Sequence, residues 1–218
     1  HSLTHKRPRA EPGLSAAAER PRGVVPFVGL TGGLGAGKST ALAALGRLGA
    51  DVISSDEVVH SLYDEPAVRE AVVARFGADV ATDGTVDRAL VAQRAFARAE
   101  DRAWLEGLLW PLVGERVQAW LAAARSRQPP PPAAVVEVPL LFEAGLEAAY
   151  DATIAVVADE DLRRRRAAAR GHAEVDARDG RQLSQEQKAA RATYVVSNDG
   201  SEEELEEKLS SVLAKLQQ

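Results

Sequence analysis

The sequence predicts an α/β fold in which helices cover both faces of a parallel sheet. Short apolar runs alternate with helical stretches along most of the 218 residues, and a glycine-rich turn follows the first run. Short apolar strands separated by helices are typical of parallel sheets. The apolar fraction of 45% is that of an ordinary globular protein. We expect the connections between strands to cross over in the right-handed sense.

Five segments are predicted to be strands, because each is short and apolar. They are residues 27–31, 51–53, 134–138, 153–158 and 194–196. The first run ends in glycines, and Asn198-Asp199-Gly200 follows the last. Both ends are therefore predicted to turn sharply.

Helices are predicted between these strands. Residues 38–48 place three leucines on one helical face, and Gly49 is a good stop signal. A long helical stretch covers residues 56–127 without any strand, so it is predicted to be an insertion between two strands. Four sites are expected to punctuate this stretch: Pro66, Gly77, Asp83-Gly84 and Pro111.

Three more helices are predicted in the C-terminal part, at residues 161–170, at 184–192 and from Ser201 onward. Ser201 and Glu204 have the spacing of a capping box, which satisfies amide groups at a helix start. The last helix carries an apolar stripe that is expected to face the core. Its members are Leu205, Leu209, Val212, Leu213 and Leu216.

The composition excludes several kinds of protein. The chain has no cysteine, which rules out disulfides, thiolate metal sites and cysteine nucleophiles. No apolar run approaches the roughly 18 residues of a membrane span, and the net charge of −5 argues against a nucleic-acid-binding surface. Residues 1–26 are rich in proline, arginine and alanine without apolar periodicity, so we predict a disordered tail before a domain at 27–218.

Residues 32–39 read Gly-Gly-Leu-Gly-Ala-Gly-Lys-Ser and fit the phosphate-binding P-loop pattern in full. Its glycines let the backbone curl so that several N–H groups point at phosphate oxygens, and the positive end of the next helix faces the same anion. Lys38 is predicted to reach the β and γ phosphates of ATP, and the Ser39 hydroxyl to bind Mg²⁺. The predicted nucleotide-binding residues here are Gly32, Gly35, Ala36, Gly37, Lys38, Ser39 and Thr40.

A chance glycine-rich turn is the alternative for this motif, and the predicted strand before it and helix after it speak against chance. A dinucleotide-binding reading fails because Lys38 stands where its third glycine is needed. A P-loop alone names a superfamily, since GTPases, ATPases and small-molecule kinases all carry one.

Asp56 follows the second predicted strand. Ligands of such sheets bind beyond the carboxyl ends of the strands, so this carboxylate is expected near the γ-phosphate. There it could take a proton from an acceptor hydroxyl or orient it. The alternative is that Asp56 merely caps the next helix.

Charged and aromatic residues elsewhere have two readings each. Arg166 and Arg170 could clamp the triphosphate, whereas Arg163–Arg165 are expected to lie on a solvated face. Glu137 could help to hold Mg²⁺ or be an ordinary strand-end acid, and Glu143 could face the substrate. The tryptophans of the insertion, at 104, 110 and 120, are expected to be core residues more than pocket walls.

With these residues in view, the chain resembles the dephospho-CoA kinases. The family's Leu-Thr-Gly-Gly is matched at residues 30–33, its aspartate by Asp56, and its Val-Pro-Leu-Leu-Phe-Glu in full at residues 138–143. Weaker matches in the family's spacing are Arg166 and Arg170, then Arg178, Gln182 and Lys188, and the turn at Asn198. The resemblance spans about residues 27–216.

This resemblance implies a P-loop kinase core with strand order 2-3-1-4-5, a helical CoA-binding insertion at 57–128 and a small lid at about 160–192. It implies a cytoplasmic enzyme that uses ATP and Mg²⁺ to phosphorylate the ribose 3′-hydroxyl of dephospho-CoA, a small-molecule substrate, without nucleic-acid or membrane partners. Lys38, Asp56 and Arg170 would be catalytic, and Arg166 and Asn198 would bind the nucleotide.

The chain departs from the family pattern at three positions. Ser54 stands where a second aspartate is common, Trp110 replaces the histidine of a His-Pro pair, and Thr193 replaces an aspartate before the last strand. Two rival functions therefore stay open: another small-molecule kinase, for a nucleotide or a sugar, and a module that binds ATP or CoA without turnover.

Overall fold

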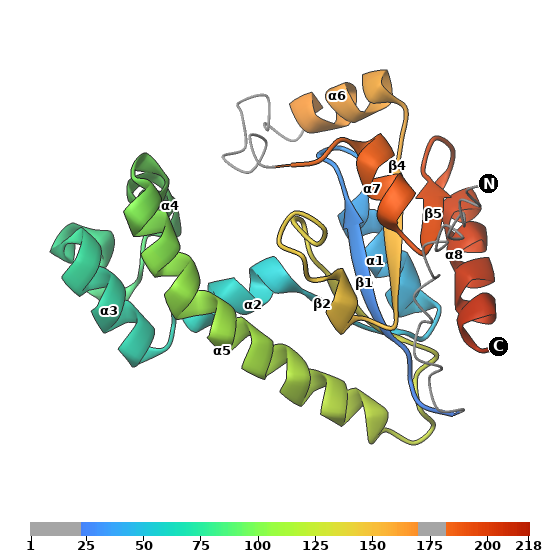
Figure 1. Ribbon diagram of the computed structural model, residues 1–218, viewed down its shortest axis with the longest axis horizontal. Coiled ribbons are helices and arrows are strands. Elements are labelled where there is room, and N and C mark those ends of the chain that lie inside the picture. The colour runs from blue at the N-terminus through green and yellow to red at the C-terminus, as the bar shows by residue number, and fades with distance from the viewer. Residues whose placement is uncertain (1–22, 170–181) are drawn as a thin grey trace, which may run out of the picture.

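The computed structural model describes residues 23–169 and 182–218 (Figure 1). Its centre is one five-stranded parallel sheet, in the order β2-β3-β1-β4-β5, which confirms the predicted order. The strands are β1 (Phe27–Gly32), β2 (Asp51–Ser54), β3 (Ala134–Glu137), β4 (Ala152–Val157) and β5 (Tyr194–Ser197).

The register brings the carboxyl ends of the strands to one edge of the sheet. Ser54 pairs with Glu137, and Val157 pairs with Ser197. Gly32, the last residue of β1, pairs with Val156 near the end of β4. Because β1 is the central strand, the glycine-rich loop leaves the sheet at the middle of this edge.

Two apolar clusters cover the two faces of the sheet. On one face, α1 (Lys38–Arg47) and α8 (Glu202–Leu216) pack against β1, β3 and β4, and the predicted stripe of α8 is buried there as expected. On the other face, the C-terminal half of α5 (Ala99–Arg125) contributes Val117, Leu121 and Ala124. The sheet is therefore a middle layer between helices, and its strands are apolar on both sides.

The predicted insertion consists of helices that project away from the sheet (Figure 1). They are α2 (Ser55–Leu62), α3 (Pro66–Phe76), the short turns η1 (Ala78–Val80) and η2 (Thr82–Gly84), α4 (Arg88–Ala97) and α5. A third apolar cluster, which includes Val72, Val80, Val91 and Leu109, lies within these helices. The insertion thus has a small core of its own.

Pro111 does not break this region, contrary to the sequence prediction, and lies inside α5. Proline removes one helical hydrogen bond, to the carbonyl four residues earlier. That residue is Gly107, and both Gly107 and Pro111 are exposed, so water can satisfy the carbonyl. The helix therefore continues through the proline.

The remaining elements follow the predicted pattern. They are η3 (Glu147–Ala149), α6 (Glu160–Ala169) and α7 (Gln185–Arg191). The Ser184 side chain caps α7 in a full capping box with Gln187, and the Ser201 hydroxyl accepts a hydrogen bond from the Glu204 amide at the start of α8. Val25, in the part of residues 1–26 that is described, is buried against the second cluster.

Candidate active site

The P-loop has the backbone shape that its glycines predict. The loop curls between β1 and α1, with Gly35 at φ 75° and Gly37 at φ 96°. These left-handed values are costly for any residue with a side chain. Lys38 opens α1 and its Nζ donates to the carbonyl oxygen of Gly32 at 3.0 Å. The amine therefore lies back over the loop, on the side from which a phosphate would approach.

Asn198 supports the loop from the end of β5. Its side chain is buried, and its Nδ2 donates to the carbonyl oxygen of Ala36 at 3.0 Å. A Cβ at Gly37 would collide with that Nδ2. Asn198 thus holds the loop backbone through its side chain.

Helix α6 lies across the P-loop and brings two arginines to it. Arg166 donates to the carbonyl oxygens of Asn198 at 2.9 Å and of Gly35 at 3.4 Å. Arg163 donates from Nε to the carbonyl oxygen of Leu34 at 3.1 Å. The prediction that Arg163 belongs to a solvated face was wrong, because this side chain is half-buried against the loop. Arg170, predicted to be catalytic, and Arg178 lie outside the described residues.

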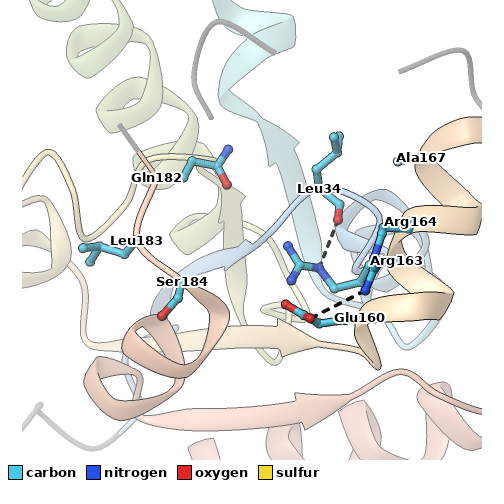
Figure 2. Close-up of a pocket in the computed structure, with 8 residues that line it drawn as sticks. All are labelled: Leu34, Glu160, Arg163, Arg164, Ala167, Gln182, Leu183 and Ser184. Atoms are coloured by element: carbon cyan, nitrogen blue, oxygen red, sulfur yellow. Dashed lines mark hydrogen bonds and ion pairs between the residues drawn. The ribbon is translucent and has the colours of Figure 1, made fainter. Parts of the chain in front are cut away.

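A cavity of about 460 Å³ opens between the P-loop and these helices. Figure 2 shows Arg163 reaching toward the Leu34 carbonyl on one side and residues 182–184 on the other. The wall of the cavity is formed by Leu34, Glu160, Arg163, Arg164, Ala167, Gln182, Leu183 and Ser184. Charged Glu160, Arg163 and Arg164 and apolar Leu34, Ala167 and Leu183 share this lining, so the space could take a ligand with both charged and apolar parts.

Asp56 lies at the second position of α2, exposed to solvent. The residue at the N-cap is Ser54, and its side chain makes no capping hydrogen bond. Asp56 is therefore not the N-cap residue of this helix but lies in its first turn. Because α2 starts directly after β2, Asp56 belongs to the same edge of the sheet as the P-loop.

The buried acid of β3 has a partner from the neighbouring strand. Ser54 Oγ donates to Glu137 Oε2 at 3.1 Å, as the paired register of the two residues allows. Glu137 is 7% exposed. One departure from the family pattern, Ser54, thus supplies a hydroxyl donor where an aspartate would bring a second negative charge.

A buried lysine fastens the segment that follows β3. Lys188 of α7 is fully buried, donates to the carbonyl oxygen of Pro139 at 3.2 Å and lies 3.5 Å from Glu143 Oε2. The Thr31 hydroxyl donates to the same carbonyl at 3.3 Å. Within the described residues, neither carboxylate oxygen of Glu143 accepts a hydrogen bond. A buried acceptor in that state is suited to a donor on a substrate.

The other two departures have different surroundings. Thr193 exchanges hydrogen bonds with Thr153, each backbone amide donating to the other residue's hydroxyl oxygen at 3.0 Å, which joins the starts of β5 and β4. Trp110 is 49% exposed on α5, so the expectation of a core residue was wrong for it. Trp104 and Trp120 are partly buried against apolar clusters, as expected.

The residues fit a magnesium ion held mainly by phosphates. Ser39 is exposed at the second position of α1, so its hydroxyl can reach a ligand. No group of three His, Cys, Asp or Glu side chains within residues 23–169 and 182–218 is arranged so that it could hold a metal ion. Mg²⁺ usually takes only one or two protein ligands beside phosphates and water, so a hydroxyl next to bound ATP is sufficient.

Sequence reasoning misplaced Arg163, named Lys188 only as a match in the family's spacing, and did not single out Gln185. Arg163 is one of four consecutive arginines, and only the packing of α6 selects it. The burial of Lys188 likewise depends on tertiary contacts, because its short helix α7 carries no apolar pattern from which burial could be predicted. Gln185 also joins the site to the sheet, since its side-chain amide bonds both the N–H and the carbonyl of Ala158, at 3.1 and 2.7 Å.

Comparison with known proteins gives consistent matches over most of the chain. The family model described as dephospho-CoA kinase matches residues 26–204. The dephospho-CoA kinase of Deinococcus radiodurans is 40% identical over 193 residues, which cover 87% of this chain and 92% of that protein. The one from Anaeromyxobacter dehalogenans is 40% identical over 194 residues, covering 87% of this chain and 91% of the relative.

Solved structures agree with the fold. The crystal structure of TT1252 from Thermus thermophilus has a TM-score of 0.74 at 33% identity and covers 88% of this chain and 98% of its own. The dephospho-CoA kinase from Campylobacter jejuni has a TM-score of 0.64 at 22% identity, covering 88% and 96%. This second likeness concerns the fold alone.

Proposed function

Because the chain belongs to the dephospho-CoA kinase family, we propose that it transfers the γ-phosphate of ATP to the ribose 3′-hydroxyl of dephospho-CoA. The products are CoA and ADP, and the reaction is the last step of coenzyme A biosynthesis. The observation that carries the proposal is the family match over residues 26–204, which includes an intact P-loop on the central strand. No helix of residues 23–169 and 182–218 is long and apolar enough to cross a membrane, and we propose a cytoplasmic enzyme.

ATP would bind with its phosphates in the P-loop. The backbone amides of Gly35 and Gly37 and the N-terminus of α1 offer donors and partial positive charge to the anion, whereas the Ala36 amide donates to the Gly33 carbonyl oxygen at 3.1 Å and shapes the loop. Lys38 would neutralise the β and γ phosphates, with Arg166 and Arg170 closing over the nucleotide and Asn198 and Gly32 keeping the loop in shape. Ser39 would hold Mg²⁺ and Thr40 would contact a phosphate.

A magnesium ion held by Ser39 would supply positive charge that neutralises the phosphates. The chain's own groups do the positioning. The 3′-hydroxyl oxygen forms a bond to the γ-phosphorus while the bond from that phosphorus to the oxygen of ADP breaks. Asp56 either accepts the proton of the 3′-hydroxyl or orients this group for attack. One phosphoryl group moves from ATP to the acceptor, and the hydroxyl proton leaves the attacking oxygen.

The helical insertion would carry the acceptor. We assign residues 57–128, mainly α2 to α5, to binding of dephospho-CoA, and residues 160–192 to a lid within the kinase domain at 27–218. The tail proposed for residues 1–26 is shorter at its C-terminal end, because Val25 is buried against the second apolar cluster. Glu143, buried and without a hydrogen-bond donor among the described residues, supports a substrate contact on the same side.

The main experiment is a turnover assay with coupled detection of ADP, with and without Mg²⁺. We expect phosphorylation of dephospho-CoA only when ATP and Mg²⁺ are both present. A panel of nucleotide and sugar acceptors tests the rival kinases. If dephospho-CoA gives no turnover above background while another acceptor does, the proposed substrate is wrong; ATP binding without any turnover would favour a binding module.

Asp56→Asn tests the role of the exposed carboxylate. We expect kcat to fall by about 10² to 10⁴-fold, the range for loss of a general base, with ATP affinity retained. Glu57→Gln is the matched control, since Glu57 is also exposed in the first turn of α2. An unchanged kcat in Asp56→Asn would remove Asp56 from the mechanism.

A further inference from the structure

One arginine of α6 occupies a position that the proposed function does not use. We propose that Arg163 is a further catalytic residue, whose guanidinium stabilises the negative charge that develops on the transferring phosphoryl group. The inference rests on the proposed kinase function, and it concerns a residue distinct from Arg166 and Arg170. Four steps support it.

The first step is the approach of Arg163 to the loop backbone. Arg163 Nε is 3.1 Å from the Leu34 carbonyl oxygen. A Cβ at Gly33 would collide with Arg163 Nη2, and a Cβ at Gly35 would collide with the Arg163 carbonyl oxygen. The contact at Gly35 is with the Arg163 backbone and therefore needs a glycine, whereas the contact at Gly33 is with the mobile end of the side chain and shows only how closely the guanidinium approaches.

The second step is that two cations converge on one corner of the P-loop. Lys38 Nζ bonds the Gly32 carbonyl oxygen at 3.0 Å, and Arg163 Nη2 lies against the adjacent Gly33. In the P-loop pattern this lysine reaches the β and γ phosphates. Arg163 is therefore beside the end of the loop that holds the transferring group. Arg166 differs, because it contacts Gly35 and Asn198 further along the loop.

The third step concerns charge. Arg164, the residue after Arg163, is exposed, and its guanidinium lies 3.2 Å from the Asp161 carboxylate and 3.8 Å from the Glu160 carboxylate. Arg163 has no carboxylate within ion-pair distance in residues 23–169 and 182–218. A half-buried guanidinium near the positive end of α1, with no carboxylate within ion-pair distance among those residues, is electrostatically unfavourable alone. The same arrangement becomes favourable when a highly charged anion binds.

The fourth step is the anchoring of α6. The Arg163 amide donates to the Asp159 carbonyl, and the Asp159 carboxylate accepts from the amides of Asp161 and Leu162. Asp159 is itself bound through its amide to the Asp199 side chain. Arg166 holds the next turn against Asn198. The guanidinium is thus presented from a fixed helix start, as transition-state stabilisation requires.

Arg163 stays protonated throughout the transfer, so it neither gives nor takes a proton. Its contribution resembles that of the arginines that assist other P-loop enzymes from the same or a partner chain. Charge on the transferring oxygens peaks in the transition state, so the effect belongs in kcat more than in the affinity for ATP.

The test compares Arg163→Gln with Arg163→Lys and with Arg165→Gln. Glutamine keeps an N–H donor for the Leu34 carbonyl but removes the positive charge. Lysine keeps the positive charge but lacks the planar, multi-donor guanidinium group. Arg165 is an exposed arginine on the same helix, so Arg165→Gln loses the same charge away from the loop. We expect kcat for dephospho-CoA to fall about 10² to 10³-fold in Arg163→Gln, less in Arg163→Lys, and within about threefold of wild type in Arg165→Gln.

A second readout does not depend on the acceptor. Binding of MgADP and of MgADP with aluminium fluoride, a mimic of the transferring phosphoryl group, is measured for each variant. We expect Arg163→Gln to retain ADP affinity and to lose most of the extra affinity that fluoride confers. Equal loss of both affinities, or no loss of either, would overturn the catalytic role. Absence of dephospho-CoA turnover in the wild type would refute the proposed substrate instead, and the binding readout would still decide the role of Arg163.

Discussion

The region around the P-loop, here called the phosphate side, and the helical insertion (α2 to α5) are stabilised by different kinds of interaction. Beside the P-loop, the buried side chains of Lys188 and Asn198 and the partly buried side chain of Gln185 donate to the backbone carbonyls of Pro139, Ala36 and Ala158, respectively. The insertion is stabilised by an apolar cluster, together with ion pairs nearer the surface, such as Arg116–Glu65 at 2.6 Å and Arg75–Asp101 at 3.0 Å.

This difference shows how one chain keeps the P-loop region in a fixed geometry next to a helical insertion that can move or unfold partly on its own. Buried hydrogen bonds to backbone demand one geometry, because any shift leaves a buried polar group unpaired. Apolar packing and exposed ion pairs tolerate small rigid movements. The 27 residues of α5 join the two regions, since Leu109 belongs to the insertion cluster and Leu121 packs on the sheet. Such a helix is about 40 Å long.

The largest effect should come from Lys188→Met, which tests the polar fastening directly. The variant leaves Glu143 buried without its cation, and breaking a buried pair costs about 3–5 kcal/mol. We expect a loss of that order in the free energy of unfolding, measured with denaturant.

Two further variants make that result specific. Lys215→Met, at an exposed position of α8, should change stability by less than about 0.5 kcal/mol. Lys188→Met combined with Glu143→Leu should recover part of the loss, because no charge is then left buried. A Lys188→Met protein as stable as the wild type would refute the idea that polar contacts hold this side.

An intermediate effect is expected from Val72→Ala in the core of the insertion. Val72 is fully buried there, and removing its methyl groups should cost about 2 kcal/mol. If the insertion is semi-independent, hydrogen exchange should speed up in α2 to α5 and remain slow in β1 and α1.

Val135→Ala is the matched substitution in the sheet, where Val135 is also fully buried. It should lower the protection of all regions together, since it weakens global folding. Identical exchange patterns for the two variants would show that the insertion and the sheet unfold as one unit, which removes the contrast.

The smallest effect concerns pH and the seam between the sheet and α5. Burial raises the pKa of Tyr150 to about 12, and its ring stacks on Phe27 with centroids 4.4 Å apart. The folded state therefore keeps the phenol proton where the unfolded state loses it. The stability that this provides is complete below about pH 10 and is lost as the pH rises toward 12.

We expect the wild type to lose roughly 1 kcal/mol by pH 11 from this group alone. Tyr150→Phe should lack that component, so the difference in unfolding free energy between the two proteins is the quantity to measure from pH 8 to 11. A difference that does not change with pH would mean that Tyr150 is not desolvated as the packing implies.

Much of the fold was readable from local pattern. All five strands and the helices between them lie within a few residues of their predicted positions, because fully apolar short runs and capping residues such as Ser184 and Ser201 are local signals. Pro111 was misjudged, since the cost of a helical proline depends on whether solvent reaches the carbonyl it leaves unpaired. Trp110 was misjudged for the same kind of reason, because exposure on a helix depends on what packs against it.

The sequence by itself determined the chemistry of the phosphate site. The P-loop needs glycines, a lysine and a hydroxyl at fixed spacing, and backbone geometry over eight consecutive residues is set locally. Tertiary structure alone decided that Arg163 joins Arg166 at that loop while Arg164 and Arg165 stay exposed, and that Lys188 is buried beside Glu143. The physical reason is range: a turn is formed by neighbours in the chain, whereas burial and charge pairing depend on residues that only folding brings together.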